Sequence, residues 1–419
     1  MTNCLTPRIS VVIPTRERWD TLGSTLQTCV DQDYDNCEII VSDNFSQDQT
    51  RSVVDAVRDP RVRYINTGRR LSMSHNWEFA LSHVRGDYVT YVGDDDGLLP
   101  GALSALATII GNTGATAISW SWASYFWPDS IHTRSRNLLF VPCRDQLHRR
   151  SAPEMLRKVL EFKQGYEQLP FFYKGLVSTA LINKVREASG GAFFHSMVPD
   201  VYSAIALSVF AEEYYYSFRP YSLNGTSAAS AGAAHFTPSL NASPAQAFLS
   251  ENNIPFHSDL AFAPSLSIGV AESFFQVRDR IAKARHYSLD IDYLLEAAMR
   301  ETARAETERY SSVVNALRAI AAKFDRSERL AILLRAYPNR PRTAIIGLEE
   351  GYNVLNRVHI INCANFGIRN VHQAAYLCAA VMHAGELGFV RNPASIARTT
   401  AILAKGAIWR ALRNRVGRR

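Results

Sequence analysis

Short apolar runs alternate with segments of helical periodicity between residues 9 and 110. Four runs have the length and composition of buried strands, and they lie at residues 9–13, 38–41, 62–65 and 87–92. The segments between them place apolar residues three or four positions apart, which is the spacing of an amphipathic helix. This alternation predicts an α/β fold with a doubly wound, mostly parallel sheet.

The rest of the chain divides into a mixed part and a helical part. Between residues 115 and 240 the pattern predicts strands near 115–120, 138–141 and 214–219 and helices near 153–163, 180–187 and 199–211. From residue 244 onward the spacing is almost wholly helical, as in 290–335 and 370–384. A stretch rich in Ser, Ala, Gly and Pro at 225–244 lies between the two parts. We therefore expect one domain over residues 1–235 and a mainly α-helical region over 245–419.

Polar residues gather where the predicted strands end. Those that directly follow the first, second and fourth strands are Thr15, Arg16, Glu17, Asp43, Asn44, Asp94, Asp95 and Asp96. In an open parallel sheet, ligands bind outside the carboxyl ends of the strands. The sequence thus predicts a ligand site at this edge of the sheet.

The acidic triplet Asp94-Asp95-Asp96 carries the clearest chemical signal. Adjacent carboxylates at the end of a buried strand repel one another, and each raises the pKa of its neighbours. A divalent cation would offset this repulsion, and oxygen ligands together with substrate phosphates suit Mg²⁺ or Mn²⁺. The alternative is a solvated acidic turn before the next helix, where carboxylates are favourable without a metal.

The net charge of +7 comes from the end of the chain. Residues 391–419 contain eight Lys and Arg and no acidic residue, so the remainder is about one charge negative. A nucleic-acid partner is therefore not indicated. Within 396–419, apolar residues including Trp409 are interleaved with basic ones, a pattern that suits an anionic membrane surface. A terminal helix packed on the domain, with a solvated basic end, explains the same pattern.

The cysteines and the N-terminal residues bear on the compartment. The six cysteines are scattered without a CxxC pair, which argues against a disulfide framework or a zinc site and indicates a reducing compartment. The N-terminal residues lack the apolar core of a secretory signal, and no apolar run is long enough to span a bilayer. We expect a cytoplasmic protein, whose basic end would allow peripheral attachment at the inner membrane face.

Three ordered segments resemble the family 2 glycosyltransferases, which have the GT-A fold. These segments are ISVVIPTRER at 9–18, EIIVSDNFSQDQT at 38–50 and GDYVTYVGDDDGLLPGAL at 86–103. The resemblance implies a GT-A domain and an inverting, metal-dependent sugar transfer. The donor would be a nucleoside-diphosphate sugar of the UDP, GDP or TDP type. The acceptor would be a glycan or a lipid-linked glycan, in the synthesis of a polysaccharide or cell-surface glycan.

The resemblance also implies roles for individual residues. The donor-binding residues would be Pro14, Thr15, Arg16, Glu17, Asp43, Asn44, Arg69, Asn76 and Asp94. Asp95 and Asp96 would hold the metal, Mn²⁺ or Mg²⁺. Arg69 and Asn76 are also explained as ordinary surface or cap residues.

Asp200 is the candidate for the base that an inverting transfer needs to take the proton from the acceptor hydroxyl. Pro199 suits the first position of a helix, which puts Asp200 in the first turn, where the helix dipole favours a carboxylate. An ordinary first-turn acid has the same pattern, and the pair Glu212-Glu213 is the fallback.

The small-residue loop from Gly225 to Gly232 has two readings. Its N–H groups can wrap a diphosphate, with His235 adding a metal contact, or the loop can be an interdomain linker.

Two other functions are compatible with the fold class. A nucleotidyltransferase generally has a glycine-rich phosphate loop after the first strand, whereas this chain has no glycine there until Gly23. A non-catalytic scaffold that has kept the fold is the other alternative, and nucleotide binding would separate it from an enzyme.

Overall fold

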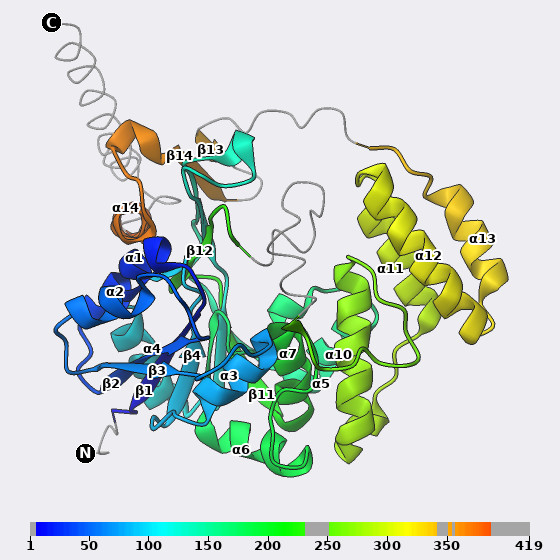
Figure 1. Ribbon diagram of the computed structural model, residues 1–419, viewed down its shortest axis with the longest axis horizontal. Coiled ribbons are helices and arrows are strands. Elements are labelled where there is room, and N and C mark those ends of the chain that lie inside the picture. Colours follow the sequence, from blue (N-terminus) through cyan, green and yellow to red (C-terminus); the bar gives the residue numbers. More distant parts are fainter. Residues whose placement is uncertain (1–5, 231–250, 342–350, 354–356, 387–419) are drawn as a thin grey trace, which may run out of the picture.

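An eight-stranded sheet forms the centre of the N-terminal part in a computed structural model that describes residues 6–230, 251–341, 351–353 and 357–386 (Figure 1). In spatial order its strands are β3 (Val62–Asn66), β2 (Cys37–Asp43), β1 (Ile9–Thr15), β4 (Tyr88–Tyr91), β10 (Gly175–Ser178), β6 (Ala117–Trp120), β11 (Glu213–Ser217) and β9 (Leu147–Ser151). Strands β1 to β4 are parallel, whereas β10 runs antiparallel to both β4 and β6. The predicted α/β class with a mostly parallel sheet is confirmed.

Helices cover both faces of this sheet. They are α1 (Trp19–Val30), α2 (Thr50–Ala56), α3 (Met73–Leu81), α4 (Ala102–Thr113), α5 (Ala152–Leu160), α6 (Thr179–Ala188) and α7 (Pro199–Phe210). Val11 of β1 packs with Leu26 of α1 on one face, and Val12 packs with Trp77 of α3 on the other. Because β1 is buried on both sides, its sequence is a continuous apolar run rather than an alternating one.

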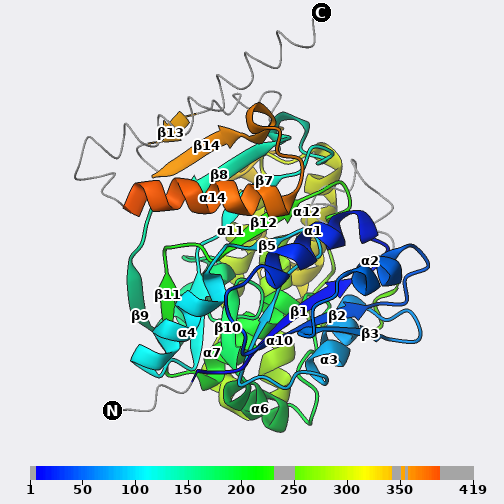
Figure 2. The same cartoon turned by 90° about the vertical axis from the view of Figure 1, so that its left-hand side faces the viewer.

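A second, six-stranded sheet lies beside the first. In spatial order its strands are β13 (Gly351–Asn353), β14 (Val358–Asn362), β8 (Leu138–Pro142), β7 (Ala123–Phe126), β12 (Ser222–Thr226) and β5 (Gly97–Leu98). The helix α14 (Val371–Glu386) lies across this sheet beside α1 (Figure 2). His372 and Tyr376 of α14 contact the Asp31 carboxylate at 2.7 and 2.9 Å.

The expectation of an almost wholly helical second half is therefore wrong at β13 and β14. Strand β14 pairs with β8, from Val358 opposite Pro142 to Asn362 opposite Leu138, so this segment returns to the N-terminal part. Such long-range strand pairing leaves no local periodicity over a five-residue segment.

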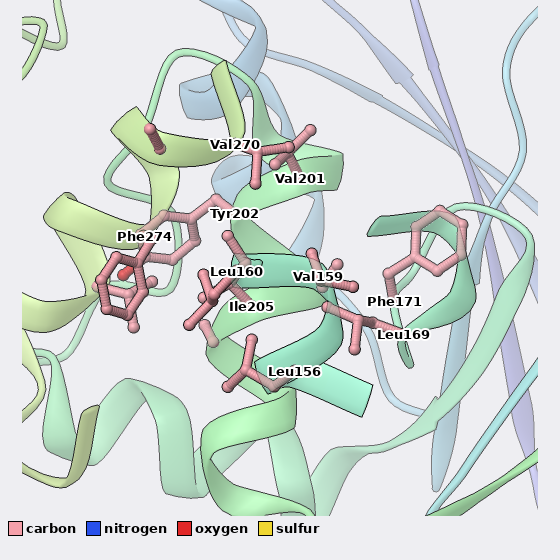
Figure 3. Close-up of a cluster of buried hydrophobic side chains, with 14 of the residues drawn as sticks. Leu156, Val159, Leu160, Leu169, Phe171, Val201, Tyr202, Ile205, Val270 and Phe274 are labelled. Carbon is pink, nitrogen blue, oxygen red and sulfur yellow. The ribbon is translucent and has the colours of Figure 1, made fainter. Parts of the chain in front are cut away.

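The predicted helical pattern is confirmed in the segment that precedes β13. Its helices are α10 (Leu266–Arg280), α11 (Ile291–Thr302), α12 (Thr307–Lys323) and α13 (Ser327–Ala336), which together are called the helical region. Short 3₁₀ helices complete the described chain, at η1 (Thr133–Ser135), η2 (Tyr166–Gln168), η3 (Ala282–His286) and η4 (Cys363–Phe366). Figure 3 shows Phe274 of α10 beside Tyr202 and Ile205 of α7 and Leu160 of α5. This apolar contact joins the helical region to the large sheet.

Several predictions concern residues outside the described ranges. The domain division near 235–245, His235 and the basic segment 396–419 all lie there, and each stays a prediction. Among the helices that are described, none combines the length and the apolar character needed to cross a bilayer.

Candidate functional site

The site lies at the carboxyl ends of β1, β2 and β4. In the order β3-β2-β1-β4 the strands run backward in sequence from β3 to β1, and the next strand, β4, comes later in the chain. Ligands of open α/β sheets bind at such a switch point between two strands, here β1 and β4. Thr15 ends β1 opposite Asp43 at the end of β2. The Thr15 hydroxyl donates to Asp94 Oδ2 at 2.7 Å, which joins the end of β1 to the acidic triplet.

The three aspartates of the triplet are buried, with exposed fractions of 5% for Asp94, 6% for Asp95 and 3% for Asp96. Arg18 lies against two of them: its guanidinium is 2.9 Å from Asp94 Oδ1 and 2.7 Å from Asp95 Oδ2. A guanidinium presents parallel N–H groups that match carboxylate oxygens, so Arg18 balances charge that would otherwise repel.

The small-residue loop folds onto the triplet. The Ser227 N–H and hydroxyl donate to Asp95 Oδ2 at 3.2 and 2.8 Å, and the Ser230 hydroxyl donates to the same oxygen at 2.5 Å. The Gly225 N–H donates to Asp96 Oδ1 at 2.7 Å. The described part of the loop thus wraps the carboxylates themselves, and the binding of a diphosphate by its N–H groups stays a prediction.

The three carboxyl groups have different proton affinities. Burial raises the pKa of Asp94 to about 6, although Arg18 opposes the shift. Burial and the neighbouring Asp95 raise the pKa of Asp96 to about 7. Burial would also raise the pKa of Asp95, but Arg18 and the hydroxyls of Ser230 and Ser227 hold it below its usual value. Asp95 is therefore the carboxylate of the triplet that stays ionised most readily.

The segment before β10 joins the triplet to Asp200. The Tyr173 hydroxyl donates to Asp96 Oδ2, and Lys174 follows it with a left-handed φ of 62°. Burial lowers the pKa of Lys174 to about 8, against the opposing charges of Asp96, Asp200 and Glu167. Asp96 and Asp200 therefore both lie close enough to Lys174 for their charges to raise its pKa.

Asp200 lies in the first turn of α7, as predicted, with Pro199 before it. Its Oδ2 accepts a hydrogen bond from the Tyr166 hydroxyl at 2.7 Å. Burial raises the pKa of Asp200, although Tyr166, the Val201 N–H and Lys174 each lower it. Burial is therefore the largest influence on the proton affinity of Asp200. The fallback Glu213 lies on β11, paired with the exposed Arg149.

The other predicted donor-binding residues form the rim of the site at the ends of β1 and β2. Asp43 accepts from Tyr64 at 2.5 Å and from Asn66 at 3.0 Å, and Asn44 exchanges two hydrogen bonds of 2.8 Å with the Leu71 backbone. These contacts attach β3 and the segment after it to the end of β2. Asp43 therefore lies beside the site, with its carboxylate hydrogen-bonded to Tyr64 and Asn66.

The residues after β1 lie on the same rim, and Pro14 within β1 is half-buried. Glu17, with a left-handed φ of 52°, pairs with Arg70. Arg16 pairs with Glu251 from the segment before α10.

Two further residues predicted to bind the donor differ in burial. Asn76 is buried on α3 and accepts from the Ser42 hydroxyl at 2.8 Å, so it fastens α3 to β2. Arg69 is exposed in the segment after β3. Their assignment to the donor stays a prediction.

The described residues fit a divalent cation only in part. They contain no group of three or more His, Cys, Asp or Glu side chains arranged to hold one. The Arg18 guanidinium between Asp94 and Asp95 is a stand-in cation, which shows that the two carboxylates can share a positive charge. An ion there would need phosphate oxygens to complete its ligands and would need Arg18 to move away. Asp96 instead faces Tyr173 and Gly225, and its role as a metal ligand stays a prediction.

Sequence reasoning missed several residues of the site. Arg18 follows the predicted Thr15, Arg16 and Glu17 directly, so its place near a strand end was a usable signal. Tyr166 in η2, and Tyr173 and Lys174 just before β10, gave none, because their place depends on β10 inserting antiparallel beside β4. Only the tertiary fold brings them to Asp96 and Asp200.

Residues 10–175 match the family model described as Glycosyl transferase family 2. The resemblance predicted from the three segments is therefore confirmed over this part of the chain. A GalNAc(5)-diNAcBac-PP-undecaprenol beta-1,3-glucosyltransferase of Campylobacter jejuni is 39% identical over 103 residues, which are 24% of this chain and 33% of the relative. The Escherichia coli enzyme WfaP, a UDP-Glc:alpha-D-GlcNAc-diphosphoundecaprenol beta-1,3-glucosyltransferase, is 27% identical over 88 residues, or 21% of this chain and 35% of WfaP.

These matches span about a third of the length of each curated relative. Among solved structures, Staphylococcus aureus TarS 1–349 in complex with UDP-GlcNAc superimposes with a TM-score of 0.48 at 13% identity, covering 84% of this chain and 99% of that one.

Proposed function

We propose that this chain, whose residues 10–175 form a family 2 glycosyltransferase domain, transfers a sugar with inversion from a nucleoside-diphosphate donor to an acceptor hydroxyl. The observation that carries the proposal is that the charges of Asp96, from the triplet, and of Asp200 both act on the Lys174 ammonium group. Charge compensation for a diphosphate and a base for a hydroxyl are the two requirements of such a transfer.

The chain's own residues divide the chemistry between them. Asp200 accepts the proton of the acceptor hydroxyl while the hydroxyl oxygen forms a bond to the anomeric carbon. The bond from that carbon to the diphosphate oxygen breaks, and the diphosphate leaves with the electron pair. Lys174 and Arg18 supply positive charge on the side of the triplet. A bound Mn²⁺ or Mg²⁺ at Asp95 would stabilise the charge that builds on the leaving diphosphate.

We further propose a lipid-linked acceptor. The names of the Campylobacter jejuni and Escherichia coli relatives both specify acceptors linked to undecaprenol through a diphosphate. The basic, apolar sequence at 396–419 supports attachment to an anionic membrane on the cytoplasmic side. The nucleotide base and the sugar are left open by these residues.

A thermal-shift titration with UDP-, GDP- and TDP-sugars, with and without Mn²⁺, tests the donor site. A ligand at 100 times its Kd stabilises a protein by about 2.7 kcal/mol, which is well within reach of the method. We expect one nucleotide series to raise the Tm and Asp95→Ala to abolish this effect. Asp200→Asn should keep the shift but lose sugar transfer.

The rival functions give different results in the same titration. If no nucleotide stabilises the chain, the scaffold alternative is favoured and the proposal fails. If nucleoside triphosphates stabilise it and diphosphate sugars do not, a nucleotidyltransferase is favoured. Asp55→Ala, in an exposed pair with Arg51, is the matched control and should leave every shift unchanged.

A further inference from the structure

A cavity of about 580 Å³ lies between the large-sheet part of the chain and the helical region. One wall comes from the end of α5 and the residues after it, including Val159, Phe162 and Tyr166. The opposite wall comes from Leu266 and Val270 of α10 and from the neighbouring turns of α11 and α12. Small-molecule sites commonly enclose about 300–1,000 Å³, so the volume suits a ligand.

The cavity adjoins the candidate base through one side chain. Tyr166 lines the cavity, and its hydroxyl donates to Asp200 Oδ2 at 2.7 Å. A molecule in the cavity would thus lie one side chain away from the group that takes the acceptor proton. The donor side of the site, at the triplet, is reached from Asp200 through Lys174 instead.

The lining combines an apolar wall with surplus positive charge. Its charged residues are Lys163, Arg300, Arg309 and Glu301. Glu301 is engaged by Arg309 at 2.7 Å and by the Ser267 N–H at 3.0 Å. Arg300, exposed at the end of α11, has no hydrogen bond or ion pair within the described ranges. Lys163 pairs with Glu161 at 2.7 Å, so Arg300 is the lining cation available for an anionic ligand beside the apolar surface.

The turn that ends α5 positions one apolar wall of the cavity. Phe162 has a left-handed φ of 53°, and the N–H groups of Phe162 and Lys163 donate to the carbonyls of Val159 and Lys158 at 2.9 Å, the pattern of a helix C-terminus. On the other wall, Val270 belongs to the same apolar cluster as Val159 (Figure 3).

We propose that this cavity binds the diphosphate-linked, apolar end of the acceptor, with Arg300 on the phosphates and the chain against Phe162 and Leu266. The assignment to the acceptor rests on the proposed function. The chemistry that recognises the ligand is a cation for phosphate and an apolar wall for alkyl groups.

Calorimetric titration with geranyl diphosphate tests the proposal on the full chain. We expect saturable binding to the wild type and about ten-fold weaker binding to Arg300→Gln, the effect of losing one charge-assisted hydrogen bond. The matched control is Arg304→Gln, an exposed arginine just after α11 that does not line the cavity, and it should bind as the wild type does. Inorganic pyrophosphate and geraniol, which each carry half of the chemistry, should both bind more weakly than geranyl diphosphate.

The outcome separates this proposal from the donor site. Binding of geranyl diphosphate should survive Asp95→Ala, whereas nucleotide binding should survive Arg300→Gln. Equal binding by wild type and Arg300→Gln, or pyrophosphate binding as tight as geranyl diphosphate binding, would overturn the cavity assignment even if nucleotides bind. If no nucleotide binds but Arg300-dependent binding persists, the proposed function fails and the cavity stands as a binding site.

Discussion

Arg18 supplies the positive charge that Asp94 and Asp95 share in the folded chain. Its Nε is buried without a hydrogen-bond partner in the described residues, while its two other nitrogens contact the carboxylates and one of them also donates to the Ser227 hydroxyl at 2.6 Å. A cation that binds Asp95 must therefore compete with Arg18. A metal bound at Asp95 would take over part of the positive charge that Arg18 supplies.

We predict that Arg18→Ala lowers the free energy of unfolding by about 3–5 kcal/mol in the presence of EDTA, because it leaves two buried carboxylates uncompensated. Mn²⁺ should restore part of this loss and should raise the Tm of the variant more than that of the wild type. Thermal denaturation with and without Mn²⁺ measures both effects.

The control for this prediction is Arg51→Ala. Arg51 pairs with Asp55 at 2.7 Å, but both side chains are more than half exposed, at 61% and 54%, so its loss should change little. A Mn²⁺ response that is the same in Arg18→Ala and the wild type would contradict the idea of competition.

Tyr166→Phe addresses the proton affinity of Asp200. The Tyr166 hydroxyl lowers the pKa of Asp200, so its removal should raise that pKa further. A base works only when ionised, and the acid limb of the pH–rate profile for sugar transfer should therefore move to higher pH. Steady-state rates measured from acidic to alkaline pH give the shift.

Tyr202→Phe is the matched control. Tyr202 lies on α7 together with Asp200, and its hydroxyl is buried with no hydrogen-bond partner in the described residues. Its profile should coincide with that of the wild type. If both variants moved the acid limb equally, Tyr166 would have no specific link to the base.

At the scale of elements, the hydrophobic pattern predicted the parallel strands β1 to β4 within a few residues. Each is a short apolar run ended by polar residues, and Asp43 and Asp94–Asp96 lie where the runs predict. The position and the direction of β10 in the sheet could not be predicted from the sequence, because its pairing with β4 and β6 is decided by tertiary packing. For that reason Asp200 could be predicted by resemblance, whereas its partners Tyr166 and Lys174 could not.

Strand β12 brings its backbone against the triplet, and this close approach requires glycine. A Cβ at Gly225 would lie 1.7 Å from the Asp95 carbonyl oxygen, far inside contact distance. We predict that Gly225→Ala destabilises the chain by at least about 1–3 kcal/mol, the usual range for overpacking, and weakens nucleotide binding. Urea denaturation and the nucleotide thermal shift measure the two consequences.

Gly269→Ala provides the comparison within the same chain. Gly269 lies inside α10, and apart from its chain neighbours and the helix's own nearby backbone no heavy atom is within 4 Å of an added Cβ, so alanine should stabilise the helix by up to about 1 kcal/mol. A Gly225→Ala variant as stable as Gly269→Ala would mean that β12 can move away from Asp95 without loss.

At the scale of the whole molecule, the helical region is attached to the large sheet through α10. Besides the apolar contact with α7, the buried Glu272 of α10 accepts from Gln276 at 2.7 Å and from the hydroxyl of Ser196, just before α7. Both the Asp200 turn and the cavity depend on this junction. A charged group at its centre makes the attachment sensitive to pH.

We predict that Glu272→Gln becomes more stable relative to the wild type as the pH rises. Burial raises the pKa of Glu272 above 4.5, although Ser196 and Gln276 oppose the shift. A raised folded-state pKa means that the stability contributed by this group is fully present below its unfolded-state pKa. That contribution is lost as the pH rises through the folded-state value. Glutamine does not titrate, so the Tm difference between variant and wild type should increase from pH 4 toward neutrality and then level off.

Glu154→Gln, which removes an exposed partner of Lys158, should show no such rise. A Tm difference that is constant across this range would mean that Glu272 has the same pKa in the folded and the unfolded chain, and would contradict the predicted effect of burial.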